Sequence, residues 1–270
     1  MKKTFSLLSL GLFLFIQCSP VPITGRHQIN LIPQSQMLAL SFQSYDQFIK
    51  EHKIIKETKD AQQVAMVGKS IQQAVEQYFK MQKKSDLLNG YEWEFNLVKD
   101  STINAFAMPG GKTAVLTGIL PVTQNVNGLA VVLGHEIAHA VARHGNERMS
   151  QLLLVQLGGM ALSEALSEQP ELTQELALIA FGVGTQVGVL LPYSRIQESE
   201  ADRLGLIFMA MAGYDPHEAV NFWERMEKQG GPKIPEFLST HPAAENRIEN
   251  IKKLIPEAMK YYRNDKKPES

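Results

Sequence analysis

Two stretches in the first third of the chain repeat apolar residues every three or four positions. They cover residues 34–52 and 59–83. In the second stretch, the positions at this spacing are Val64, Val67, Ile71, Val75 and Tyr78. A helix of 3.6 residues per turn places such positions on one side. We therefore predict two amphipathic helices that serve as scaffold.

After Tyr91 the pattern changes to an alternation of apolar and polar residues. Trp93, Phe95 and Leu97 alternate with polar neighbours, which is typical of a strand with one buried face. Two more strands are expected at 104–108 and 112–117, on either side of a Pro-Gly-Gly turn. The sequence therefore predicts a small sheet in this region.

An apolar run at 131–144 contains the pattern His-Glu-x-x-His. His135 and His139 are four residues apart, so both imidazoles of a helix could reach one zinc ion. Glu136 could then act as general base towards a metal-bound water. The alternative is an amphipathic core helix with two incidental histidines.

The expected helix begins near Asn127 and ends near His144, with Gly145 as a left-handed cap. His144 lies five residues after His139. In the metzincin pattern of zinc ligands, the third histidine lies six residues after the second. We interpret His144 as a cation at the helix end. A third ligand must come from elsewhere.

A second group of charged residues lies at 194–203. Glu198 and Asp202 are four residues apart on one helical face, so one carboxylate could bind zinc while the other steadies a ligand histidine. Glu200 points to the opposite side and is expected to be solvated or salt-bridged. The alternative is a solvent-exposed helix surface on which Glu198 and Asp202 pair with Arg195 and Arg203.

His241 precedes Pro242 and the last predicted helix. This histidine could be a simple helix cap, or it could approach the metal site from across the fold.

The segment at 104–108 could hold an extended substrate if it forms a sheet edge near the metal. Its residues are Asn104, Ala105, Phe106, Ala107 and Met108. A buried structural strand explains the same pattern equally well.

Residues 151–191 are apolar and contain several glycines. A transmembrane hairpin is one interpretation, but the longest uncharged run, 176–192, is interrupted by polar residues and glycines. We favour two helices that pack over the site.

Composition narrows the function only slightly. The 270 residues carry a formal net charge of -1, and the basic residues do not cluster with aromatic ones, which argues against a nucleic-acid partner. A hydrophobic content of 44% indicates a folded chain. The single cysteine excludes an intrachain disulfide.

That cysteine, Cys18, follows a basic start and a short apolar run. We predict a signal peptide at 1–17, lipidation of Cys18, a tether at 18–33 and a charged tail at 261–270. Gln17 departs from the small residue usual before a lipidated cysteine, and an ordinary secretory signal is the alternative. Either way, we expect an exported protein.

Four ordered motifs together resemble the M48 family of zinc metallopeptidases, closest to its short bacterial envelope lipoproteins. The motifs are 104–111, 133–139, the pair Glu198 and Asp202, and 240–242. The resemblance implies that the zinc ligands are His135, His139 and Glu198. It also implies the following roles: Glu136 as catalytic base, Asp202 as partner of a ligand, His241 as oxyanion stabiliser or cap on the zinc, and Arg247 as an ion-pair partner.

The predicted fold is therefore α+β and mostly helical, a gluzincin-type metallopeptidase domain at 34–260 with a small β-sheet beside the active-site helix. We expect one Zn²⁺ per chain and hydrolysis of misfolded or stalled envelope proteins. The expected location is the cell envelope, facing the periplasm and anchored by lipid, in the outer rather than the inner membrane. The alternative is a zinc-dependent chaperone or assembly factor whose proteolysis is latched off.

Overall fold

The computed structural model describes residues 18–21, 24–186, 190–229, 234–241 and 246–263. The predicted signal peptide, Pro242 and most of the charged tail lie outside these ranges. The strands are β1 (Cys18–Pro20), β2 (His27–Ile29), β3 (Ile54–Ile55), β4 (Glu94–Val98), β5 (Ala105–Ala107) and β6 (Lys112–Leu116). The α-helices are α1 (Gln34–Glu51), α2 (Lys59–Met81), α3 (Leu120–Thr123), α4 (Val126–Val141), α5 (His144–Ala165), α6 (Glu171–Thr185), α7 (Leu191–Met211), α8 (Glu218–Lys228), α9 (Glu236–Thr240) and α10 (Arg247–Ala258). Short 3-10 turns lie at Ser85–Leu88, Thr117–Ile119 and Met259–Tyr261.

The predicted mostly helical α+β fold is confirmed. Helices α1 and α2 match the two amphipathic stretches, and the apolar positions of α2 are buried. Strands β4, β5 and β6 occupy the three expected positions. Between β5 and β6 the chain turns through Gly110 and Gly111, whose φ angles of +91° and +90° favour glycine.

The four-stranded sheet has the order β3-β4-β6-β5. Strands β4 and β6 are parallel, while β3 and β5 run antiparallel to their neighbours. In the described part of the chain β5 pairs with β6 alone, so it forms one edge of the sheet. A second, two-stranded sheet joins β1 to β2.

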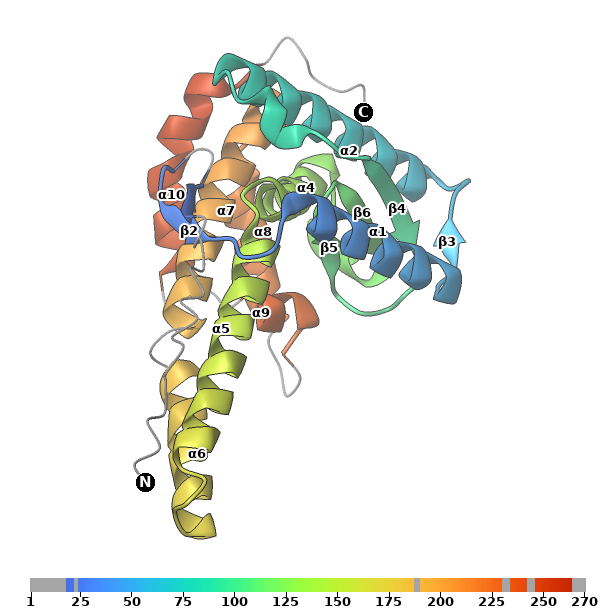
Figure 1. Ribbon diagram of the computed structural model, residues 1–270. Helices are drawn as coiled ribbons and strands as arrows, with labels where there is room; N and C mark the ends of the chain where they lie inside the picture. The colour runs from blue at the N-terminus through green and yellow to red at the C-terminus, as the bar shows by residue number, and fades with distance from the viewer. Residues whose placement is uncertain (1–17, 22–23, 187–189, 230–233, 242–245, 264–270) are drawn as a thin grey trace, which may run out of the picture.

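Helix α4 lies in the middle of the fold, between α2, α7 and β5 (Figure 1). Every residue from Gly128 to Val141 is buried. A helix that is apolar on all sides needs packing partners on all sides. The chemistry-bearing residues of α4 therefore lie in the core rather than on the surface.

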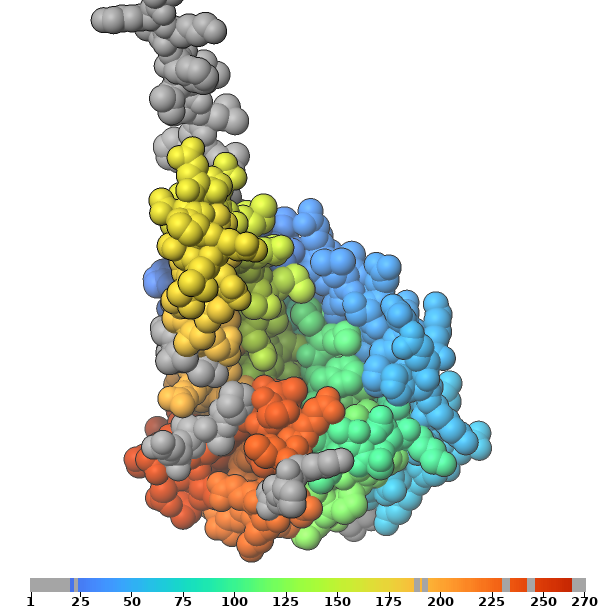
Figure 2. Space-filling model, turned by 90° about the horizontal axis from the view of Figure 1, so that it is seen from below, coloured from blue at the N-terminus to red at the C-terminus, as the bar shows by residue number. Residues whose placement is uncertain are grey.

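Helices α5 and α6 correct the expectation for residues 151–191. They form a hairpin that projects from the body of the molecule, so α6 does not pack over the site (Figures 1 and 2). Among its described side chains α6 buries none. None of the helices in the described ranges combines the length and apolar character that a membrane span needs.

The break between α4 and α5 also differs from the prediction. Helix α4 ends at Val141, and Arg143 takes the left-handed conformation with φ +63°. A new helix then starts at His144, so Gly145 lies inside its first turn and is not a cap. Because of this break, the chain changes direction before His144 and turns that residue back towards α4.

Candidate metal centre

Helix α4 brings His135 and His139 together on one face. Its first turn is capped by the side chain of Asn125, which accepts hydrogen bonds from the backbone N–H groups of Asn127 and Gly128 at 2.9 and 3.0 Å. One turn of helix places the two Nε2 atoms 3.1 Å apart. Both imidazoles therefore point to the same place.

Helix α7 supplies a carboxylate to that place. Glu198 Oε2 lies 3.2 Å from His135 Nε2, and its Oε1 lies 3.3 Å from His139 Nε2. Glu198 is only 3% exposed. A buried carboxylate is stable only with charged or hydrogen-bonding partners. Here those partners are ring nitrogens and the Arg247 guanidinium, whose Nη2 lies 3.5 Å from Oε2.

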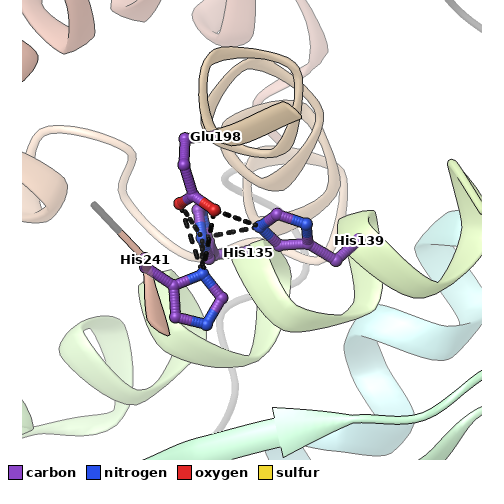
Figure 3. A group of neighbouring side chains, drawn as sticks. All are labelled: His135, His139, Glu198 and His241. Atoms are coloured by element: carbon purple, nitrogen blue, oxygen red, sulfur yellow. Dashed lines mark hydrogen bonds and ion pairs between the residues drawn. The ribbon is translucent and has the colours of Figure 1, made fainter. Parts of the chain in front are cut away.

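His241, at the C-terminal end of α9, completes the group (Figure 3). Its Nδ1 lies 3.3 Å from His135 Nε2 and 3.1 Å from Glu198 Oε1. Helix α9 is held beside β5, because Asn104 donates to Glu236 and the Phe237 N–H donates to the Ile103 carbonyl, at 3.0 and 3.1 Å. His241 is thus placed against the ligands and is not a solvent-exposed cap.

These four side chains fit a zinc ion. Each offers one donor atom, and all four atoms lie within 4.8 Å of one another. Bonds of about 2.0–2.1 Å in a tetrahedron imply donor separations of roughly 3.3 Å, close to the short contacts observed. Three imidazole nitrogens and one carboxylate oxygen are a donor set that zinc accepts. Arg247 Nη2 also borders the cluster, 3.5 Å from Glu198 Oε2 and from His135 Nε2.

Glu136 lies on the same helix with a free acceptor. It is 3% exposed, and its Oε1 accepts no hydrogen bond from any described residue, although His241 Nε2 lies 3.3 Å away. An unsatisfied buried carboxylate oxygen is costly in a folded protein. Beside a cluster of metal donors, it is suited to accept a proton from water.

The electrostatics of the metal-free cluster follow from burial and from these contacts. Burial by itself lowers the pKa of His135, but hydrogen bonds to Asp202 and Glu198 outweigh it and raise the pKa to about 9. Burial dominates at His139 and lowers its pKa well below the usual value. For Glu198, the effect of burial is outweighed by the three histidines, which lower its pKa.

Asp202 lies on the far side of His135 from the donor cluster. Its Oδ1 is 3.0 Å from His135 Nδ1, and Arg247 donates to both of its oxygens at 2.6 and 2.9 Å. Burial raises the pKa of Asp202, but Arg247 and His135 outweigh this and lower it. The Arg247 guanidinium carbon stacks 3.4 Å from the ring centroid of Trp223. Asp202 is therefore fixed between an arginine and a candidate zinc ligand.

His144 and Glu200 make contacts behind His139 that their sequence positions did not predict. His144 is completely buried and begins α5, so it is not an exposed residue at the end of α4, and burial lowers its pKa. Its Nδ1 lies 2.8 Å from His139 Nδ1, and its Nε2 lies 3.2 Å from Glu200 Oε2. Glu200 is buried and salt-bridged to Arg26, which agrees with one of its two expected environments. The spacing of His144 excluded it as a ligand but gave no signal for a contact behind His139.

The other candidate residues lie as follows. Strand β5 runs beside α4 at the sheet edge, so the segment from Asn104 to Met108 is next to the metal site. Cys18 begins β1, where its backbone pairs with Ile29. The substrate role of β5 and the lipidation of Cys18 stay predictions.

The sequence profile of peptidase family M48 matches residues 27–255. The chain belongs to this family. This confirms the family predicted from the motifs, and the converging histidines and glutamate are its metal-site candidates.

Several known proteases are similar to more than half of the chain. It is 34% identical to mitochondrial metalloendopeptidase OMA1 of Bos taurus over 96% of this chain and 51% of the bovine protein. It is 40% identical to mitochondrial metalloendopeptidase OMA1 of Saccharomyces cerevisiae over 66% of this chain and 51% of the yeast protein. A putative beta-barrel assembly-enhancing protease of Vibrio cholerae is 33% identical over 57% of this chain and 33% of that protein. The chain thus spans about half the length of the two OMA1 proteins.

Proposed function

We propose that this protein is a zinc-dependent endopeptidase. The observation that carries the proposal is the convergence of His135, His139 and Glu198 on one point. Beside them, Glu136 Oε1 accepts no hydrogen bond from any described residue. Two neutral imidazoles and one carboxylate are a known ligand set for catalytic zinc. The names of the related metalloendopeptidases support the same activity.

When bound, zinc supplies a Lewis acid that polarises the peptide carbonyl and makes water more acidic. His135, His139 and Glu198 would hold it. Glu136 takes a proton from the attacking water at Oε1 and passes it to the leaving nitrogen of the cleaved peptide bond. The apolar walls of α4 around Glu136 exclude bulk water, which strengthens its interactions with the reacting groups.

His241 closes the proposed zinc site in this structure. Its Nδ1 lies among the donor atoms, so it would compete with water or substrate for a zinc ion held there. The four donor side chains are all buried. This favours the second candidate function, a chaperone or assembly factor whose proteolysis is latched off until His241 moves away.

Glu136→Gln tests the proposal. This variant should keep its fold and its zinc but lose cleavage of casein, because an amide cannot accept the proton. Glu227→Gln, an exposed substitution on α8, is the matched control and should cleave at the wild-type rate. Zinc content and casein cleavage are measured side by side. Cleavage by Glu136→Gln at the wild-type rate would show that the base is another residue.

For location, the proposal is the cell envelope, facing the periplasm and anchored by a lipid on Cys18, in the outer membrane. The support is the basic and apolar start of the chain before Cys18. Misfolded or stalled envelope proteins are the proposed substrates, as for the short envelope lipoproteins that the motifs resemble. Mass spectrometry of the mature N-terminus tests the anchor. A diacyl or triacyl Cys18 is expected, and an unmodified terminus would exclude it.

A further inference from the structure

The two candidate histidine ligands differ in what holds the ring nitrogen that faces away from the cluster. His135 Nδ1 contacts Asp202 directly, and Arg247 holds Asp202. Ligand histidines usually donate this second N–H to a carboxylate or carbonyl, which orients the ring and increases its basicity. For His135 the orienting unit is a carboxylate–arginine pair.

His139 also has a carboxylate–arginine pair behind it, but another histidine, His144, stands between them. His139 Nδ1 contacts His144 Nδ1 at 2.8 Å, and His144 Nε2 contacts Glu200 Oε2 at 3.2 Å. A ligand histidine that uses Nε2 carries its proton on Nδ1. His144 must therefore accept at Nδ1 and donate from Nε2, so its tautomer is fixed and it needs a carboxylate acceptor. Glu200 is that acceptor.

Glu200 is in turn held by a loop from the N-terminal part of the chain. Arg26 donates to Glu200 Oε2 from Nε and Nη2 at 3.1 and 2.8 Å, and the Thr24 hydroxyl donates to Oε1. The same guanidinium donates to Glu147 at 2.7 and 2.8 Å. Burial raises the pKa of Glu200, but the hydrogen bonds from His144, Arg26 and Thr24 outweigh it and lower the pKa to about 2.

Arg26 therefore neutralises two carboxylates on different helices. Glu147 of α5 is fully buried, and Glu200 of α7 is 7% exposed. Gln197 also donates to Glu147, at 2.8 Å. Without Arg26, the two buried carboxylates would lie close together with no cation between them. Thr24 and Arg26 precede the segment at 27–255 that the family profile matches.

We propose that Arg26, Glu200 and His144 are positioning residues that orient His139 as a zinc ligand. The N-terminal loop is then part of the metal site, although it acts only through other side chains. This inference rests on the zinc site of the proposed function. The site has two arms of the same design: His135–Asp202–Arg247, and His139–His144–Glu200–Arg26.

The test measures zinc affinity of the full chain by competition with a chromophoric chelator. Arg26→Ala and Glu200→Gln should bind zinc about 10–100-fold more weakly than wild type, as for loss of other residues behind a metal ligand. Arg26→Lys keeps the charge and should recover part of the affinity. Arg203→Ala is the control. Arg203 is also on α7, but its ion pair is with Glu257 of α10. It should bind zinc like wild type.

Two further readouts separate positioning from a purely structural role. The Co²⁺-loaded Arg26→Ala and Glu200→Gln variants should show altered visible absorption, because His139 is no longer held in one orientation. Urea unfolding of the chelator-treated proteins measures the structural contribution alone. If Arg26→Ala fails to fold, Glu200→Gln decides.

Zinc affinity reduced less than about tenfold in Glu200→Gln, with an unchanged Co²⁺ spectrum, would overturn the inference while leaving the proposed function intact. A wild-type protein that takes up no zinc would overturn the proposed function, and this inference with it.

Discussion

Gly134 of α4 and Gly205 of α7 touch backbone to backbone where the two helices cross. A Cβ atom on Gly134 would lie 2.8 Å from the Gly205 carbonyl oxygen, and one on Gly205 would lie 2.8 Å from the His135 nitrogen. Neither backbone group can move aside as a side chain could. This close approach lets Glu198 reach His135 and His139 from the neighbouring helix.

Gly205→Ala should therefore separate α4 from α7. We expect the free energy of unfolding to fall by about 1–3 kcal/mol, which is typical of overpacking, and zinc affinity to fall with it. Chemical unfolding and chelator competition measure the two effects. Gly184→Ala on α6 is the control, since a Cβ there meets nothing within 4 Å. That substitution should be neutral or stabilising. Equal stability of both variants would contradict the role given to the crossing.

His241→Ala tests the closed form of the site. We expect casein cleavage to become severalfold faster, because the ring that lies among the donor atoms is removed. Ser239→Ala changes an exposed side chain of the same short helix and should leave the rate unaltered. A severe fall in kcat for His241→Ala would instead assign this histidine to oxyanion stabilisation.

The substrate role of β5 can be tested through a single N–H group. Asn104 and Met108 bond to β6, so by strand alternation Ala107 directs its N–H to the free edge. Ala107→Pro removes that donor at an edge position where proline is tolerated. We expect KM for an extended peptide to rise while kcat changes little.

Ala107→Val keeps the N–H and is the matched control. If the proline and valine variants have the same KM, the edge of β5 does not bind substrate through this group.

The ion pair between Arg203 of α7 and Glu257 of α10 should make a small, pH-dependent contribution to the free energy of unfolding. The hydrogen bond from Arg203 lowers the pKa of Glu257 below its ordinary value of 4.5. A carboxyl group whose pKa is lower in the folded state stabilises the fold at pH values above 4.5, its ordinary pKa. This contribution is lost as the pH falls through the lowered pKa of the folded state. Glu257→Gln should cost less than about 1 kcal/mol at neutral pH, because the pair is partly exposed.

Urea unfolding of wild type and Glu257→Gln, at neutral pH and below pH 4.5, measures this difference. The two proteins should converge in acid. A difference that persists there would show that Glu257 acts by packing and not by charge.

Local features of this protein could be predicted from sequence because they depend on neighbouring residues. The helical period fixed α1 and α2, alternation located β4, and the spacing of His135 and His139 placed both rings on one face. The spacing of Glu198 and Asp202 also predicted a shared face, although not which histidine each would contact.

Only the tertiary structure decided what depends on packing between distant segments. His144 lies behind His139 because the chain reverses at Arg143, a residue whose left-handed conformation no periodicity predicts. Arg26 reaches Glu200 because a loop folds across α5 and α7. The sequence by itself thus offered candidate zinc ligands and predicted their local helices. Distances between those helices are set by contacts such as Gly134 with Gly205, which a linear pattern does not encode.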